Sequence, residues 1–296
     1  MFEYKYKVPK EDLGTTYGSI CIKNIVFEPG EIEKVLPDIV FDDNNLKDMF
    51  AEDDLDDDKR KCIYKRFIPK VRTSLEMEMF IKDSIDENKS FYSFLAEGIL
   101  GLIFKDLYGY KLSKGVIDVY DTLVDSHTGV DACMYSVEDN VIILGEAKFY
   151  KDFDDGITRI IGDFINKSIK NKLESLQRAS ENCSDSCKII MKNLFLDDVD
   201  ELTIDEFMNQ TIIFAGFILH SEVDVSEYNN INFYDKYTIS VEKLKNNINN
   251  SLNISCAKGD YEIIMVHLPI GDKKRLIAKV IETAQSKLKG MKKLYE

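Results

Sequence analysis

An acidic residue and a Glu-x-Lys pair stand close together in this chain, in a context that could support phosphoryl chemistry. Asp131 opens one apolar run, and Glu146 and Lys148 follow the next, Val141–Leu144. That second run is apolar at every position, which predicts a strand with two covered faces. Alternate strand residues share a face, so Glu146 and Lys148 project together while Ala147 points into packing. Because burying unpaired charges is costly, we expect both to face a cleft and hold a metal ion and a phosphate.

The spacing also predicts that Asp131 lies beside Glu146. Residues 131–137 read as a strand and residues 138–140 as a turn, so the two runs form a hairpin. Two neighbouring carboxylates repel each other, and a divalent cation between them removes the repulsion. Mg2+ (or Mn2+) suits such hard oxygen ligands. The ion would polarise a phosphoryl oxygen and activate water, with Lys148 stabilising charge or orienting the water. This is the chemistry of metal-dependent phosphodiester hydrolysis.

An acid on one strand followed by Glu-x-Lys on the next resembles the signature of the PD-(D/E)XK, or restriction-endonuclease-like, nuclease superfamily. The departure is Val130, which stands where that signature has proline. Other pairs in the chain share the spacing, for example Glu87 and Lys89, but they do not follow an apolar strand. The context therefore distinguishes Glu146 and Lys148 from these pairs.

Members of the superfamily often carry a further glutamate on a helix before the two strands. The apolar run 91–104 predicts a helix in which Glu97 is the only charged residue. The motifs around Asp131 and Glu146 are His127-Thr-Gly-Val-Asp-Ala132 and Leu144-Gly-Glu-Ala-Lys-Phe-Tyr150. In these two motifs the sequence resembles HamA, the nuclease subunit family of Hachiman anti-phage defence systems. The similarity is best over about residues 90–178.

The resemblance implies a set of roles for these residues. Asp131, Glu146 and the backbone carbonyl of Ala147 would hold magnesium, Glu97 would orient its waters or hold a second ion, and Lys148 would position the nucleophile. It also implies a DNase effector paired with a helicase subunit, HamB, that restrains it. The fold implied is α/β, a restriction-endonuclease-like core with a mixed central sheet flanked by helices, plus an N-terminal extension.

Composition limits how such a protein could engage DNA. The chain has 296 residues, an apolar fraction of 44% and a net charge of −14. Phosphate contacts supply most non-specific affinity, so we expect weak, salt-sensitive DNA binding and a partner that delivers nucleic acid. The sequence contains no P-loop, which leaves any motor activity to that partner. Scattered cysteines and the lack of a long apolar run predict a cytoplasmic protein that does not enter a membrane.

We divide the chain at a soft boundary into residues 1–72, a β-rich N-terminal region with an acidic segment, and residues 73–296, the nuclease-like domain. The acidic segment, 42–58, contains nine Asp and Glu residues. It reads either as a solvated or disordered loop or as an electrostatic plug that occupies a basic surface or guards the site. We also expect it, with the basic helix 272–293, to contact a partner.

The remaining elements follow from apolar periodicity. We expect strands at 14–28, 115–124, 130–137, 141–149, 211–219 and 261–268, and helices at 73–87, 91–104, 156–179 and from 272. In the helix at 73–87 we expect Leu75, Met79 and Ile85 to make the contacts. The polar face of 156–179, beside the site, would line a nucleic-acid groove. The candidate nucleic-acid-binding residues there and nearby are His127, Lys151, Arg159, Lys167 and Lys170.

Two other functions fit the same residues. In the first, the site is a relic and the chain is an inert structural or regulatory subunit of a helicase complex. In the second, the chain is a nuclease of the same superfamily that acts on RNA or on branched DNA. A solvated ion pair at a strand end would explain Glu146 and Lys148 in the first case.

Overall fold

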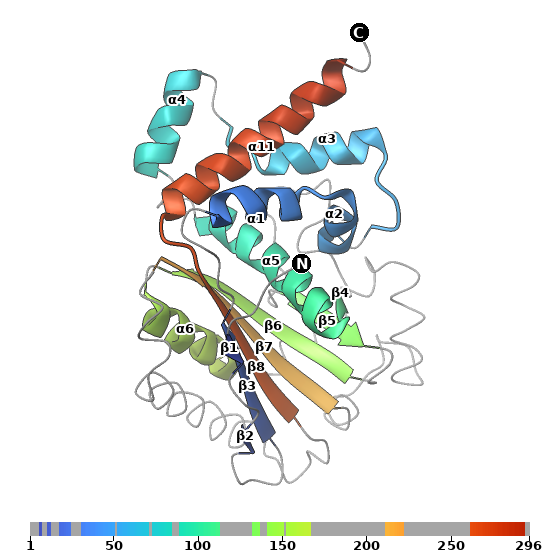
Figure 1. The fold of residues 1–296 in the computed structure, drawn as a ribbon, viewed down its shortest axis with the longest axis vertical. Helices are drawn as coiled ribbons and strands as arrows, with labels where there is room; N and C mark the ends of the chain where they lie inside the picture. The colour runs from blue at the N-terminus through green and yellow to red at the C-terminus, as the bar shows by residue number, and fades with distance from the viewer. Residues whose placement is uncertain are drawn as a thin grey trace.

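A mixed β-sheet forms the centre of the molecule (Figure 1). The computed structural model describes residues 6–7, 11–12, 18–24, 31–50, 52–70, 73–84, 89–112, 132–136, 141–150, 152–166, 211–221 and 261–293. In these residues the sheet has eight strands. They are β1 (Tyr6–Lys7), β2 (Glu11–Asp12), β3 (Gly18–Asn24), β4 (Lys111–Leu112), β5 (Ala132–Ser136), β6 (Val141–Tyr150), β7 (Thr211–His220) and β8 (Tyr261–Pro269).

The four long strands run parallel to one another. The strand order is β1-β3-β8-β7-β6-β5-β4, with β2 also paired to β3. The β6–β7, β7–β8 and β3–β8 pairs are parallel, whereas β4, β5, β1 and β2 pair antiparallel. Strands β6 and β7 carry runs of isoleucine and other apolar residues, as central strands covered on both faces require. The prediction of an α/β protein with a mixed central sheet is confirmed.

Helices cover both faces of the sheet. They are α1 (Ile32–Val40), α2 (Asp43–Phe50), α3 (Asp57–Arg66), α4 (Ser74–Met79), α5 (Lys89–Tyr108), α6 (Phe153–Asn166) and α11 (Lys273–Lys293), with a π-helical turn, η1 (Phe80–Ser84), after α4. In Figure 1, α6 lies on one face of the sheet and α5 on the other. Helices α1, α2, α3 and α11 form a further layer beyond α5. In the part of the chain described, no helix is long and apolar enough to cross a membrane.

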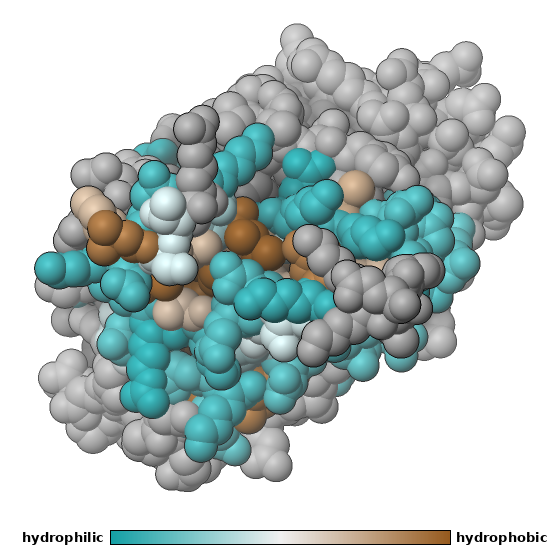
Figure 2. Space-filling model, turned by 90° about the horizontal axis from the view of Figure 1, so that it is seen from above, coloured by the Kyte–Doolittle hydropathy of each residue, from teal (hydrophilic) through white to brown (hydrophobic). Residues whose placement is uncertain are grey.

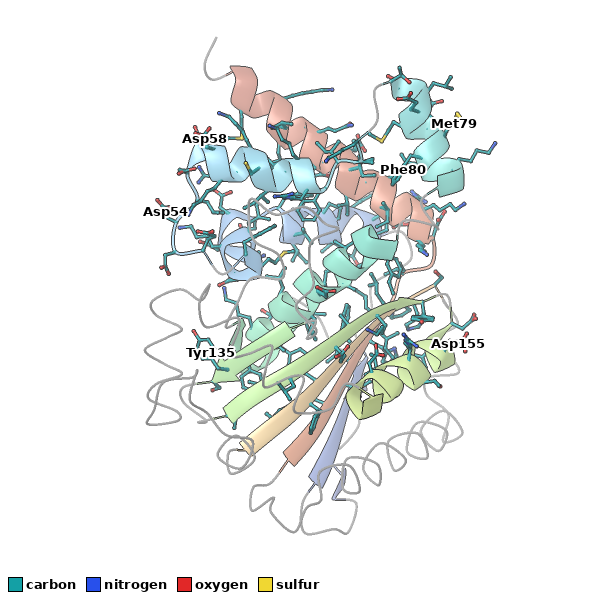
Figure 3. All side chains as sticks on the ribbon, turned by 180° about the vertical axis from the view of Figure 1, so that it is seen from behind. Asp54, Asp58, Met79, Phe80, Tyr135 and Asp155 are labelled. Carbon is teal, nitrogen blue, oxygen red and sulfur yellow. The ribbon has the colours of Figure 1, made fainter. Side chains whose placement is uncertain are left out.

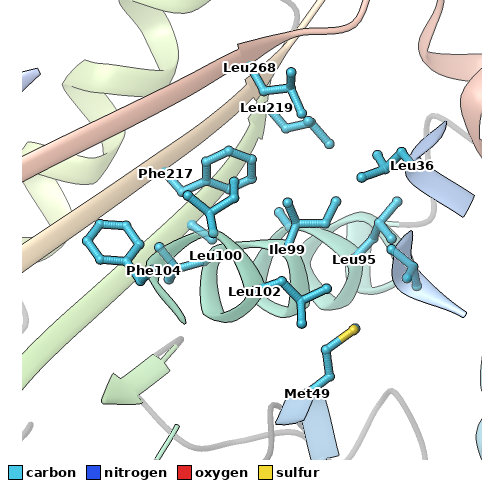
Figure 4. Close-up of a cluster of buried hydrophobic side chains, with 14 of the residues drawn as sticks. Leu36, Met49, Leu95, Ile99, Leu100, Leu102, Phe104, Phe217, Leu219 and Leu268 are labelled. Atoms are coloured by element: carbon cyan, nitrogen blue, oxygen red, sulfur yellow. The ribbon is translucent and has the colours of Figure 1, made fainter. Parts of the chain in front are cut away.

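The larger core lies between the sheet and α5. Phe217 and Leu219 of β7 and Leu268 of β8 pack there against Leu95 and Ile99 of α5 (Figure 4). All five side chains are fully buried. The apolar residues of α1, α2, α3 and α11 extend this cluster away from the sheet. The helix predicted at 91–104 is therefore confirmed as a buried core helix, α5.

The acidic segment 42–58 differs from the expected loop. In its described residues the segment forms α2 and the first turn of α3, so the interpretation as a loop is wrong there. The described part of residues 1–72 contains the strands β1, β2 and β3 and the helices α1, α2 and α3. Asp56 caps α3 by accepting a hydrogen bond from the backbone N–H of Lys59 at 2.8 Å. Arg60 pairs with Asp43 at 3.1 Å and with Asp57 at 3.2 Å. The helix N-terminus and these ion pairs therefore stabilise several of the acidic side chains within the segment.

The central sheet contains strands from both sides of the domain boundary proposed near residue 72. Strand β3 comes from before it and pairs along its whole length with β8, which comes from after it. Helices α1 and α3 likewise pack against α11. The N-terminal region thus contributes to the same sheet and the same helical layer as the rest of the chain.

Several element ends also differ from expectation. Thr73 makes the predicted cap, as a full capping box with Glu76, but Leu75 and Met79 of α4 are exposed instead of buried (Figure 3). The helix predicted from Gly156 begins earlier, at Phe153, and its continuation past residue 166 lies outside the described residues. The strand expected at 115–124 and the contact expected of Ile85 also lie outside them.

Candidate functional site

Glu146 and Lys148 project from the same face of β6. The residue between them, Ala147, is buried in the core on the α5 side. Strand residues alternate between faces, so Glu146 and Lys148 point to the opposite side, which α6 covers. The predicted alternation along β6 is therefore confirmed. Glu146 is completely buried, so the carboxylate lies within the protein layer and not on an open strand end.

Lys148 is held between two carboxylates. Its Nζ lies 3.3 Å from Oε2 of Glu146 and 3.0 Å from Oδ2 of Asp163, which comes from α6. Arg159 approaches the other oxygen of Asp163, with Nε 3.6 Å from Oδ1. The exposed fractions of the side chains are 0% for Glu146, 16% for Lys148, 12% for Asp163 and 62% for Arg159. Glu146, Lys148 and Asp163 thus form a cluster of opposite charges that is largely withdrawn from solvent, and the mostly exposed Arg159 approaches it from α6.

Close packing of α6 on the sheet brings Asp163 to Lys148. A Cβ atom placed on Gly156 would lie only 2.7 Å from Cγ2 of Ile218 on β7. A Cβ on Gly216 would in turn meet a methyl group of Ile160 on α6 at 3.3 Å. A glycine on each partner therefore lets the helix and the sheet approach more closely than larger residues allow.

Two buried histidines pack beneath the start of α6. Nε2 of His220 lies 3.2 Å from Nδ1 of His267, and the ring of Phe153 packs on both. Burial lowers the pKa of His220 to about 3. Burial, and then the neighbouring His220, lowers the pKa of His267 well below its ordinary value. Both rings are therefore neutral near pH 7, and they form a structural pair, as expected from their positions at strand ends.

The structure places the predicted site residues in three groups. Glu146, Lys148 and Arg159 come together on the α6 side of the sheet. Glu97 lies on α5, the helix that covers the opposite face of the sheet (Figure 1), and its role in a metal centre stays a prediction. The third group lies outside the described residues and comprises Asp131, His127, Lys151, Lys167 and Lys170.

Asp131 lies outside the described residues, but Ala132, which follows it in the chain, lies within them. The β5–β6 ladder begins with Ala132 opposite Gly145. Asp131 precedes the first of these residues in the chain, and Glu146 follows the second. Within the described ranges, no group of three or more His, Cys, Asp or Glu side chains is close enough to hold a metal ion.

Asp163 is the residue that sequence reasoning missed. The apolar stripe of its helix was visible, and Asp163 falls beside that stripe, flanked by Gly162 and Phe164. The signal that could have found it is the spacing Gly156, Ile160, Asp163, which places three residues on one face of the helix. A carboxylate on the helix face that packs against the strand carrying Glu-x-Lys predicts an ion pair with that lysine.

The two predicted partner surfaces lie at the helical end of the molecule. Figure 2 shows this end as mainly hydrophilic, with hydrophobic residues between polar ones. Several cations of α11 have local partners there: Arg275 with Glu33 at 3.8 Å, Lys279 with Glu282 at 2.8 Å, and Lys287 with the backbone carbonyl of Phe41. The basic character of this helix is thus partly neutralised within the chain.

Comparison with known proteins gives one match. A model of the HamA family matches residues 120–284, which include β5, β6, α6, β7, β8 and the first half of α11. Comparisons with curated proteins and with solved structures find no match. The family match covers more than half of the chain and contains Glu146, Lys148 and Asp163. The chain therefore belongs to the HamA family.

Proposed function

We propose that this chain is a metal-dependent nuclease that cleaves DNA as part of a Hachiman anti-phage defence complex. Membership in the HamA family supports a Hachiman defence-associated subunit. The observation that carries the nuclease proposal is the buried carboxylate of Glu146 with the ammonium of Lys148 3.3 Å away, on one face of the central strand β6. An acid and a lysine on one strand face are the groups that metal-assisted phosphodiester hydrolysis requires.

The residues fit a hard divalent cation. Glu146 supplies a carboxylate, and the carbonyl of Ala147 is a second oxygen on the same strand. The proposal requires the β5–β6 ladder to continue by one pair beyond Ala132 and Gly145, which would set Asp131 opposite Glu146. Cross-strand neighbours lie about 5 Å apart, close enough for two carboxylates to share an ion. Oxygen donors of this kind favour Mg2+ or Mn2+ over softer metals.

Each residue then has a defined part in hydrolysis. When bound, the metal ion polarises the phosphoryl oxygen and makes water a better nucleophile. The water oxygen forms a new bond to phosphorus, the bond from phosphorus to the leaving sugar oxygen breaks, and that oxygen takes up a proton. Lys148 holds its ammonium toward the charge that develops on the phosphoryl group. Arg159, which is mostly exposed on α6, contacts a neighbouring phosphate of the substrate.

The order of elements supports a restriction-endonuclease-like core. Helix α5 precedes the β5–β6 hairpin, α6 follows it, and β7 returns parallel to β6. This arrangement places a helix on each face of the strand that carries Glu146. We propose the restriction-endonuclease-like core on two grounds, the order of these elements and the Glu-x-Lys motif on β6.

The charge of the chain supports a partnered enzyme. A net charge of −14 opposes binding to a polyanion, and the phosphate contacts that drive non-specific affinity need cations. A helicase subunit of the HamB type would deliver DNA and restrain cleavage until it is needed. The acidic α2–α3 region and the basic α11 remain the candidate contact surfaces.

One observation favours the alternative of an inert subunit. Glu146 is completely buried and Lys148 is held by two carboxylates, so the cluster could serve packing alone. In that case the chain would bind its partner without hydrolysing any substrate. The two functions differ in whether Glu146 and Lys148 are needed for cleavage or only for stability.

A substrate panel tests the proposal. Purified wild-type protein, alone and with its helicase partner, would be incubated with plasmid, linear duplex DNA, single-stranded DNA, branched DNA and RNA, with Mg2+ or with EDTA. We expect Mg2+-dependent cleavage of DNA that Glu146→Gln abolishes and that Lys34→Met, at an exposed position of α1, leaves intact. Absence of cleavage of every substrate, with a folded wild-type protein and a stable helicase complex, would favour the inert subunit. Preferential cleavage of RNA or branched DNA would keep the nuclease and replace its substrate.

A further inference from the structure

Asp163 has no role in the chemistry described so far, yet it is the nearer of the two carboxylates to the Lys148 ammonium. The distance from Nζ is 3.0 Å to Asp163 and 3.3 Å to Glu146. We propose that Asp163 is a positioning residue that holds Lys148 in the orientation needed for phosphodiester cleavage. The proposal rests on the nuclease function and names a further residue of the same site.

The argument begins with the flexibility of lysine. Its ammonium sits on a four-carbon stem with several rotatable bonds, so rotamer entropy opposes a single orientation. Glu146 lies on the same strand as Lys148, so their contact does not tie the lysine to any other part of the molecule. Asp163 comes from α6, a separate layer. A contact from that layer fixes the ammonium relative to both the sheet and the helix, and this is the precision that positioning of a reacting group demands.

Asp163 is itself well fixed. Arg159, one helical turn earlier, lies 3.6 Å from its second oxygen. The helix is seated by the close approach of Gly156 to Ile218 and by the packing of Phe153 on the buried histidines. A chain of contacts therefore runs from the sheet through α6 to Asp163 and back to Lys148.

The same contacts argue against Asp163 as a metal ligand. Its Oδ2 faces the Lys148 ammonium and its Oδ1 faces the Arg159 guanidinium. A divalent cation at Asp163 would lie close to both of these positive groups, whereas Glu146 contacts Lys148 through Oε2 and its Oε1 is the oxygen proposed to meet the metal. Asp163 is thus suited to orient a cation of the protein, not to bind an added one.

The test compares Asp163→Asn with a matched control, Asp155→Asn. Asp155 is exposed on the same helix and projects away from the sheet (Figure 3). Three quantities would be measured with the full-length protein: kcat and KM for DNA cleavage, the Mg2+ concentration that gives half the maximal rate, and the acetylation rate of Lys148, followed by mass spectrometry of the metal-free protein. Asp163→Glu serves as a conservative variant, and thermal melting reports whether each variant folds.

We expect Asp163→Asn to lower kcat by about 10- to 100-fold, as misplacement of a catalytic group does, with KM and the Mg2+ dependence unchanged. Lys148 should be acetylated faster, Asp163→Glu should recover part of kcat, and Asp155→Asn should behave as wild type. In a Lys148→Gln background, Asp163→Asn should cause no further loss, since the residue acts through the lysine.

Three results would overturn the positioning role. These are a wild-type kcat in Asp163→Asn, a changed Mg2+ dependence like that of a ligand variant, or an additive loss in the Lys148→Gln background. The acetylation rate separates this inference from the nuclease function on which it rests. If the wild-type protein cleaves nothing, the nuclease function fails, and an unchanged acetylation rate in Asp163→Asn would show that the lysine is not held by Asp163 either. If Asp163→Asn does not fold, Asp163→Ser replaces it in the same measurements, and a wild-type kcat with a wild-type acetylation rate in that variant overturns the proposal.

Discussion

Replacing Lys148 with methionine should destabilise the metal-free protein strongly. Methionine keeps the apolar stem and removes only the ammonium, so the change isolates the charge. Glu146 is fully buried and Asp163 is 12% exposed, and both face Lys148 within 3.3 Å. Removing one member of a buried ion pair typically costs about 3–5 kcal/mol, because the partner charge stays buried and loses an attraction that offset its desolvation. At about 2–4 °C per kcal/mol for a chain of this size, the melting temperature should fall by about 6–20 °C.

Thermal and urea unfolding of purified variants in EDTA would measure this effect. The matched control is Lys279→Met, since Lys279 pairs with Glu282 at 2.8 Å but the two side chains are 44% and 68% exposed. That surface pair should contribute less than about 1 kcal/mol. Adding Glu146→Gln to Lys148→Met should restore part of the lost stability, because it removes one of the two carboxylates that faced the Lys148 ammonium. The reasoning is refuted if Lys148→Met is as stable as Lys279→Met, or if the second substitution destabilises it further.

Three further outcomes follow from the same geometry. Gly156→Ala should lower the free energy of unfolding by about 1–3 kcal/mol, since its Cβ would clash with β7, whereas Gly290→Ala on the open face of α11 should raise it by about 0.5–1 kcal/mol; urea unfolding of both would decide. The pKa of His220 is lowered in the folded state, so the unfolded chain takes up a proton before the folded protein does as pH falls. The free energy of unfolding is therefore undiminished by this group above about pH 6.5. It falls toward pH 3, by about 1.4 kcal/mol per pH unit for each histidine. The melting temperature should therefore fall as pH is lowered from 8 to 5, and it should fall less in His267→Gln than in wild type. The same pH dependence in both proteins would contradict the lowered pKa values assigned to the two buried histidines. Glu146→Gln should weaken Mg2+ binding measured by calorimetry, and an unchanged affinity would remove Glu146 from the ligand set.

The sequence could predict the site strand because a single strand has a simple period. An unbroken apolar run followed by Glu-x-Lys was enough to place Glu146 and Lys148 on one face and Ala147 on the other, and the ladder of β6 with β7 bears this out. The pattern could not predict what covers each face. Glu97 was correctly assigned to an apolar helix, but a helix buried almost all round has no stripe to show which side of the sheet it meets.

Long-range charge pairing was the other limit. Residues 42–58 look disordered by composition, since nine acids in one segment repel. The structure forms helices there because Asp56 caps α3 and Arg60 neutralises Asp43 from 17 residues away. Asp163 was missed for the same reason, since its partner Lys148 lies on another element. Such pairs become visible only once the elements are packed.

Single-turnover cleavage of a labelled DNA duplex by excess protein, measured across a range of Mg2+ concentrations, tests the central claim most directly. The wild-type rate should rise with Mg2+ to a plateau and vanish in EDTA. Glu146→Gln should need far more Mg2+ or show no cleavage, and Lys148→Arg should lower the plateau without shifting the Mg2+ dependence, because the lysine serves the transition state and not the metal. Cleavage that persists in EDTA, or a Glu146→Gln curve that coincides with wild type, would contradict the assignment of this site as a metal-dependent nuclease centre.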